Sequence, residues 1–292
     1  MVFIEPPASR KQLEWSRFSQ KDDGSWCFNL ETYYANLFEI QKPGIMAKSN
    51  TGWRTSRSGK TIYAFFLKLN EVERAEIEEF RAAYAGYVVI GLNKNLRGFS
   101  KYDLSGCLAL GYNLHDPKGK HTELGKLEYD AKYNKSEEAF KALASFLASA
   151  VHCIPGINNS PSPRFLTSIP SSDANPSAYC LPRLLCAGII SSLDKSIFSN
   201  DTPFVQTSFR VQKRKLKGLS LAQKRIEWSR ILQNRGIQLS RTVKNATVLI
   251  VDDLYQSGTT IWNMAKYLKE VEGATEIFGL VCVKSLRDTA NR

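Results

Sequence analysis

A short segment in the last fifth of the 292-residue chain constrains the fold most strongly. It starts with the continuous apolar run Val248 to Val251, passes through Asp252 and Asp253, and continues into the turn Gln256 to Thr260 before a helix-like stretch. A continuous run rich in β-branched residues is typical of a strand buried on both faces of a parallel sheet. Ligands of such sheets bind beyond the carboxyl ends of the strands, where the two aspartates fall. The segment predicts an α/β fold with a site at one strand end.

The turn after the aspartates has the composition of an anion-binding site. Backbone N–H groups at the start of a helix attract an anion together with the helix dipole, and the hydroxyls of Ser257, Thr259 and Thr260 add donors. Gly258 lets the backbone approach a phosphate closely. Two nearby carboxylates would repel that phosphate unless they bind sugar hydroxyls or a metal ion. A ribose carrying a 5′-phosphate satisfies both halves of the motif.

Two other motifs also end a buried strand in acidic residues. Receiver domains open with such a strand, whereas Asp253 lies close to the end of this sequence. A Walker B strand requires an upstream P-loop, and the nearest segment has Gly52 seven residues before Gly59, where a P-loop has five. Both alternatives fit the sequence less well than a ribose-phosphate site does.

The length predicts two domains, because single domains usually have about 100–200 residues. We place the boundary in the Pro- and Gly-containing segment 115–121, which gives an N-terminal α+β domain of unknown role at 1–117 and a second domain at 118–292. In the second domain strand-like and helix-like segments alternate, which predicts a mostly parallel sheet flanked by helices.

Local sequence patterns also predict individual helices and strands. Residues 1–30 have the character of an irregular lead-in, and 62–69 that of a strand. Asn70 and Glu73 form a capping-box pattern at the start of a helix. Residues 122–134 alternate like a strand, and a helix is expected to follow them.

Positive charge is concentrated in one segment. The formal net charge is +12, and residues 210–244 contain eleven Lys and Arg against one acid, Glu227. Such a segment can bind a small polyanionic ligand, or it can bind the phosphates of a nucleic acid or ribonucleoprotein. The sequence leaves both uses open.

The cysteine spacing and the lengths of the apolar runs indicate in which compartment the protein is expected. The six cysteines have no Cys-x-x-Cys spacing and there are three histidines, so we expect reduced cysteines and no structural zinc site. No apolar run approaches the roughly 18 residues of a membrane span. We expect a soluble cytoplasmic protein without a membrane partner, and the oligomeric state stays open.

The apolar strand, the two acids and the Gly-Thr turn occur in order, and with them segment 246–262 resembles the phosphoribosyl-diphosphate (PRPP) binding loop of type I phosphoribosyltransferases. Its surroundings are most similar to the ComF-like branch of that family: "FLTSIPSS" resembles the strand before the pyrophosphate loop, and "KGLSLAQKRIEWSRILQNRG" the flexible loop. The resemblance extends over residues 121–292 and leaves residues 1–117 without a recognised family.

The resemblance implies a role for each matching residue. Asp252 and Asp253 would bind the ribose hydroxyls, directly or through Mg²⁺, and would be the catalytic acids. The other implied sites are a 5′-phosphate turn of Gln256, Ser257, Gly258, Thr259 and Thr260, a pyrophosphate loop with Ser171 and Ser172, a basic flexible loop with Lys213, Arg214, Lys215, Lys217 and Arg225, and acceptor contacts from Tyr129, Tyr133 and Arg287.

The sequence departs from the branch after Ser172, where Asp173 stands in place of a basic residue. Two hypotheses follow from this difference. The first is a Mg²⁺-dependent phosphoribosyltransferase with an unknown acceptor. The second is a non-catalytic ribose-phosphate or nucleotide-binding module that binds nucleic acid or a ribonucleoprotein, of the kind found among retron-type anti-phage effectors.

Overall fold

The computed structural model describes residues 16–30, 32–57, 62–84, 86–90, 103–116, 119–154, 157, 161–171, 179–193, 197–198, 203–211 and 219–286. The chain forms two compact units, residues 1–91 and 92–292. The boundary lies nearer the amino terminus than the predicted position at 117. The cause is β6 (Gly106–Tyr112), which pairs in parallel with β12 (Glu276–Lys284) and so belongs to the sheet of unit 2.

Unit 1 contains a four-stranded antiparallel sheet in the order β1-β2-β4-β3. Its strands are β1 (Ser16–Gln20), β2 (Trp26–Leu30), β3 (Arg54–Thr55) and β4 (Ile62–Phe66). The prediction of an irregular lead-in is wrong for residues 16–30, which form the β1–β2 hairpin. The hairpin is stable because Phe18 pairs with Phe28 across the strands and Phe28 packs into the core of the unit.

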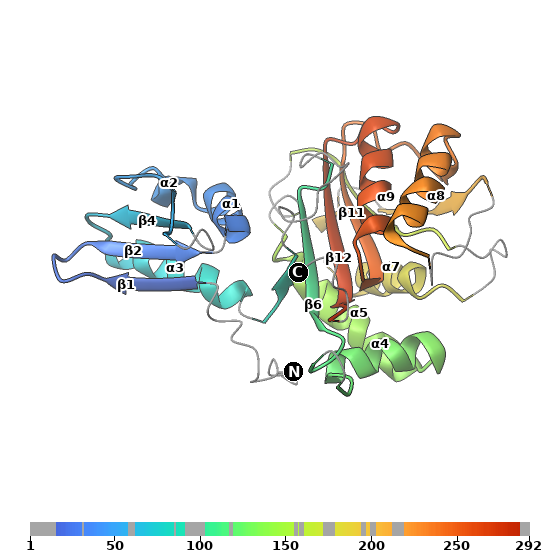
Figure 1. Ribbon diagram of the computed structural model, residues 1–292, viewed down its shortest axis with the longest axis horizontal. Helices are drawn as coiled ribbons and strands as arrows, with labels where there is room; N and C mark the ends of the chain where they lie inside the picture. Colours follow the sequence, from blue (N-terminus) through green and yellow to red (C-terminus); the bar gives the residue numbers. More distant parts are fainter. Residues whose placement is uncertain are drawn as a thin grey trace. The chain divides into compact units, whose positions relative to one another are not determined.

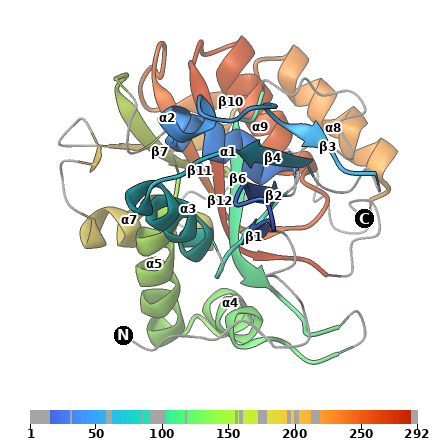
Figure 2. The same ribbon diagram turned by 90° about the vertical axis from the view of Figure 1, so that its left-hand side faces the viewer.

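The helices of unit 1 lie on one side of this sheet (Figure 2). They are α1 (Thr32–Gln41), α2 (Pro43–Met46) and α3 (Glu71–Tyr84), and the short strand β5 (Val88–Val89) follows them. The ring of Phe38 in α1 contacts that of Phe28 with centroids 4.9 Å apart. The predicted capping box of α3 is confirmed, because the backbone N–H of Glu73 donates to Asn70 Oδ1 and that of Asn70 to Glu73 Oε2.

Unit 2 is built on a parallel sheet, as predicted, with the order β6-β12-β11-β7-β8 (Figure 1). The remaining strands are β7 (Arg164–Ser168), β8 (Phe204–Val205) and β11 (Thr247–Tyr255). Helices α5 (Glu137–Val151) and α7 (Leu181–Ser192) pack together on one face. Helices α8 (Leu221–Gln233) and α9 (Thr259–Glu270) pack together on the other (Figure 2). An antiparallel ribbon pairs β9 (Thr207–Phe209) with β10 (Ile237–Leu239).

Residues 122–134 contain helix α4 (Glu123–Tyr133), so the strand prediction there is wrong. The Thr122 hydroxyl caps the helix by accepting the backbone N–H of Gly125 at 2.9 Å. Gly125, Glu128 and Ala131 are buried at helical spacing. Over so short a segment the same apolar residues fit both the period of a strand and that of a helix. The cap formed by Thr122 favours the helix.

The segment that resembles a flexible loop also contains a helix. Ser220 and Gln223 form a capping box at the start of α8, and Trp228 in the same helix is fully buried. Burial of the indole fixes α8 against the unit. Among the described residues, no helix is long and apolar enough to cross a bilayer.

Replacement of Gly125 tests how closely α4 approaches the rest of unit 2. A Cβ at this position would lie 2.0 Å from the backbone oxygen of Asn113, which cannot move aside as a side chain can. We expect Gly125→Ala to lower the free energy of unfolding by about 1–3 kcal/mol in chemical denaturation. Lys126→Ala on the exposed side of α4 should change it by less than about 1 kcal/mol. Equal stability of the two variants would contradict this packing.

Candidate functional site

A crevice opens at the carboxyl ends of β7 and β11. Pairing between these strands ends at Ser168 opposite Val251, whereas β11 continues beside β12 as far as Tyr255. The chain leaves β7 through Pro170, which has no N–H to extend the ladder. It then leads to β8 on one side, while β11 leads to β12 on the other. The crevice is therefore a topological switch point, where open α/β sheets bind ligands.

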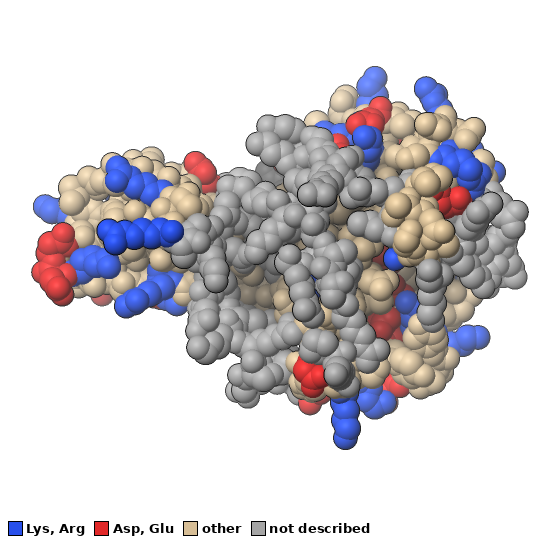
Figure 3. Space-filling model, in the orientation of Figure 1, with Lys and Arg blue, Asp and Glu red and all other residues tan. Residues whose placement is uncertain are grey.

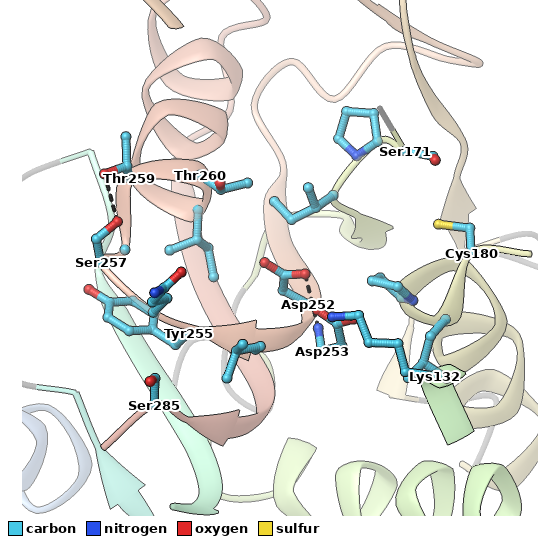
Figure 4. Close-up of a pocket in the computed structure, with 18 of the residues that line it drawn as sticks. Lys132, Ser171, Cys180, Asp252, Asp253, Tyr255, Ser257, Thr259, Thr260 and Ser285 are labelled. Atoms are coloured by element: carbon cyan, nitrogen blue, oxygen red, sulfur yellow. Dashed lines mark hydrogen bonds and ion pairs between the residues drawn. The ribbon is translucent and has the colours of Figure 1, made fainter. Parts of the chain in front are cut away.

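The crevice contains a pocket of about 640 Å³ (Figure 4). This volume lies in the range of small-molecule sites, about 300–1,000 Å³. Most of the lining comes from the end of α4, the chain after β7, the start of α7, and the end of β11 with its connection to α9; Lys224 of α8 and Ser285 after β12 complete it. Among the residues predicted from sequence, the pocket brings together Tyr133, Ser171, Asp252, Asp253, Gln256, Ser257, Gly258, Thr259 and Thr260.

Of the other predicted site residues, only Tyr129 has a described side chain. Tyr129 does not line the pocket and packs between His121 and Tyr133, with ring centroids 5.5 and 4.9 Å away. Lys224 of α8 does line it, and so brings one charge of the basic segment to the site. The predicted residues outside the described part of the chain are Ser172, Lys213, Arg214, Lys215, Lys217, Arg287 and the side chain of Arg225.

The two aspartates have different surroundings although they are neighbours in β11. Asp253 is buried, and its Oδ2 lies 2.7 Å from Nζ of Lys132 in α4 (Figure 4). Lys132 also lies 3.5 Å from Glu128 one helical turn earlier. Asp252 Oδ1 accepts the backbone N–H of Asp253 at 2.9 Å, and no described lysine or arginine forms an ion pair with it. Both carboxylates therefore line the pocket, but only that of Asp253 is paired with a described lysine.

These surroundings set the ionisation of the groups. Burial, followed by repulsion from the Asp253 carboxylate, raises the pKa of Asp252 well above its ordinary value. Burial alone would lower the pKa of Lys132, but the carboxylates of Asp253 and Glu128 raise it, so Lys132 stays charged. Burial raises the pKa of Cys180 on the pocket wall, which makes it a neutral thiol rather than a nucleophilic thiolate. Hydroxyl donors or a cation brought by a ligand would stabilise the ionised form of Asp252.

A divalent cation bound in this pocket would need ligands from the substrate as well as from the protein. Among the described residues, no cluster of three or more His, Cys, Asp or Glu side chains is arranged to hold a metal. Mg²⁺ commonly uses one or two carboxylates together with water and substrate phosphates. Asp252 fits this requirement because it faces the pocket without an ion pair to a described cation, while Asp253 is already paired with Lys132.

The turn before α9 is shaped by Gly258. This residue is the N-cap of the helix and has φ 71°, a conformation that favours glycine. A Cβ there would lie 2.1 Å from the Tyr255 hydroxyl oxygen, which accepts a hydrogen bond from Trp262 Nε1 at 3.3 Å. The Ser257 and Thr259 hydroxyls lie 3.0 Å apart. The first N–H groups of α9 have no intrahelical partner, so this end of the pocket is suited to an anion.

Lys132, Tyr255 and Trp262 are site residues that the sequence did not predict. Lys132 stands one helical turn after Glu128, and this i,i+4 spacing would have indicated an ion pair if α4 had been recognised as a helix. The side chains of Tyr255 and Trp262 pack against the turn at Gly258. Their contact depends on the geometry of the β11–α9 connection, which no sequence pattern indicates.

Comparison with known proteins gives limited matches. No family model and no curated protein matches the sequence. The chain is similar to the solved structures of a hypoxanthine phosphoribosyltransferase from Staphylococcus aureus, at 11% identity over 54% of this chain and 69% of that chain with a TM-score of 0.34. A hypoxanthine-guanine phosphoribosyltransferase from Bacillus anthracis matches at 12% identity over 51% and 68%, with a TM-score of 0.31. Similarity at this level does not assign the chain to a family.

Removal of Lys132 tests its role in neutralising the strand end. Lys132→Met leaves two adjacent carboxylates without a paired cation, and we expect unfolding to become easier by about 1–3 kcal/mol, because the ammonium is partly exposed. Mg²⁺ should raise the melting temperature of this variant more than that of the wild type. Lys132→Arg, which keeps the charge, is the control. A Lys132→Met variant that is as stable as the wild type and no more sensitive to Mg²⁺ would contradict the ion-pair role.

Proposed function

We propose that unit 2 binds PRPP with Mg²⁺ and transfers its phosphoribosyl group to an acceptor, releasing diphosphate. The observation that carries the proposal is the arrangement on β11 and α9 of two carboxylates beside a helix N-terminal turn, at the switch point of a parallel sheet. A ligand that matches must present hydroxyls or a cation to the acids and an anion to the turn. A sugar phosphate has that distribution of groups.

The pocket supports a specific orientation of the ligand. The ribose 2′- and 3′-hydroxyls lie toward Asp252 and Asp253, and the 5′-phosphate lies in the turn from Gln256 to Thr260. The ion pair with Lys132 holds the Asp253 carboxylate in position to accept a hydroxyl proton. The diphosphate points toward Ser171, which lies across the pocket from the turn (Figure 4), and toward Lys224, which also lines the pocket.

The reaction breaks the bond between C1′ of the ribose and the diphosphate oxygen, and the acceptor forms a new bond to C1′. The sugar becomes positively charged as diphosphate leaves, so carboxylates near the ring stabilise the transition state. Bound Mg²⁺ would neutralise part of the charge on the leaving group. Lys224 adds a positive charge from the chain, and Lys213, Arg214, Lys215 and Lys217 belong to the connection between β9 and α8 that precedes it.

The acceptor is the least constrained part of the proposal. Tyr133 lines the pocket and is 57% exposed, so its ring can stack on a planar acceptor such as a base. If diphosphate release is absent but ribose 5-phosphate binds, the pocket serves a non-catalytic sensing role, the second hypothesis from the sequence. The same assays therefore separate catalysis from binding alone.

Asp252→Asn tests the proposal with the shape of the side chain preserved. We expect at least a tenfold loss of Mg²⁺-dependent PRPP binding and of diphosphate release, because a hydrogen-bonded charged group contributes about 1.5–3 kcal/mol. The variant should also be more stable than the wild type at neutral pH, since a buried carboxylate with a raised pKa is removed. Asp130→Asn on α4, outside the pocket, is the control. Unchanged PRPP binding by Asp252→Asn would remove the assignment.

Gly258→Ala tests the phosphate end of the pocket. The added methyl group meets the Tyr255 hydroxyl and the positive φ disfavours alanine, so the turn must change shape. We expect ribose 5-phosphate to bind at least tenfold more weakly in calorimetry. Gly273→Ala is the matched control, because Gly273 also has a positive φ of 73° but does not line the pocket. Equal losses of affinity in both variants would show that strain alone, and not the turn, is responsible.

A further inference from the structure

The sheet of unit 1 has one face that no helix covers among the described residues. Strand register places Phe18, Phe28 and Ala64 on the same face, and α1 packs on it through Phe38. Arg81 of α3 donates to Ser16 on that face as well. Figure 2 shows α1, α2 and α3 on this one side of the strands. The opposite side, called here the open face, consists of Arg17, Ser19, Cys27, Asn29, Arg54, Tyr63 and Phe65.

Two aromatic rings lie next to each other on the open face. Tyr63 and Phe65 are two residues apart in β4, and their ring centroids are 5.3 Å apart with an interplanar angle of 71°. Both side chains are half-buried, so each ring keeps part of its surface exposed. Because the hydrophobic core of unit 1 is on the other side of the sheet, these rings are not needed to fill it. Aromatic side chains on an open sheet are suited to stacking on nucleic-acid bases.

Positive charge flanks these rings. Arg17, Asn29, Tyr63 and Arg54 are direct cross-strand neighbours and form one row across β1, β2, β4 and β3. Both arginines are exposed, and no described acidic side chain forms an ion pair with either. Strands lie about 4.8 Å apart, so the ends of the row are separated by roughly 14 Å. The open face contains no acidic residue, and Figure 3 shows several Lys and Arg side chains on the surface of unit 1.

We propose that the open face binds single-stranded nucleic acid. Bases stack on Tyr63 and Phe65, and backbone phosphates on either side pair with Arg17 and Arg54. Stacking accepts any base, so binding has little sequence preference. A base inside a duplex is already stacked on its neighbours, so a duplex presents no free base to the rings. This site is separate from the basic segment 210–244 and does not depend on the function proposed for unit 2.

Fluorescence anisotropy of the full chain with labelled oligouridine and oligothymidine tests the proposal. Each oligonucleotide has roughly 16 nucleotides, the upper site size of single-strand binding folds. The double variant Tyr63→Ile with Phe65→Ile keeps β-propensity but removes the rings. Its affinity for both oligouridine and oligothymidine should fall by at least about fivefold. The swap Tyr63→Phe with Phe65→Tyr keeps two rings and should bind as the wild type does. Circular dichroism checks that each variant is folded.

The arginines are tested through the salt dependence of binding. Arg17→Ala with Arg54→Ala should reduce the slope of log K against log salt by about 1.4, since each phosphate contact on a single strand contributes about 0.7. Lys42→Ala with Lys48→Ala removes the same charge beside α2 and should leave the slope nearly unchanged. Binding that survives loss of the rings, or a duplex that competes as well as a single strand, would place the nucleic acid elsewhere and overturn the proposal. No binding to either oligonucleotide would overturn it as well.

Discussion

The ion pair between Lys132 and Asp253 allows two adjacent carboxylates to occupy the end of a buried strand. Without a cation, the two carboxylates would repel each other more strongly in a region with little water. Lys132 reaches Asp253 from α4 at 2.7 Å and leaves Asp252 to face the pocket. The position of α4 depends in turn on the Thr122 cap and on the close approach of Gly125 to Asn113. The electrostatics of the site therefore rest on a helix outside the strand–turn–helix motif.

The shape of the pocket follows from unequal strand lengths. Pairing of β7 with β11 ends at Ser168, and β11 continues with β12 on its other side. The residues from Asp252 to Tyr255 thus line an open crevice instead of a continuous sheet. Gly258 then turns the chain into α9, with Tyr255 and Trp262 packed beneath it. Acids and anion-binding turn come from one continuous segment, which fixes the distance between them.

The sequence predicted the part of the site that is local in the chain. The apolar strand, the acids, the turn and α9 are consecutive, and each has a composition that indicates its structure. Lys132 could not be predicted, because its role requires both the helical state of 123–133 and the packing of α4 against β6 and β12, which brings its end to Asp253 of β11. The same limit applies to the boundary between the units. β6 precedes the predicted boundary in sequence, but its partner β12 lies more than 150 residues away.

Calorimetric titration of the full chain with PRPP, with and without Mg²⁺, tests the central claim most directly. We expect saturable binding that strengthens when Mg²⁺ is present, because Asp252 and the diphosphate together supply ligands for the ion. Ribose 5-phosphate, which lacks the diphosphate, should bind more weakly and with little response to Mg²⁺. Absence of PRPP binding by a folded protein under both conditions would contradict the account.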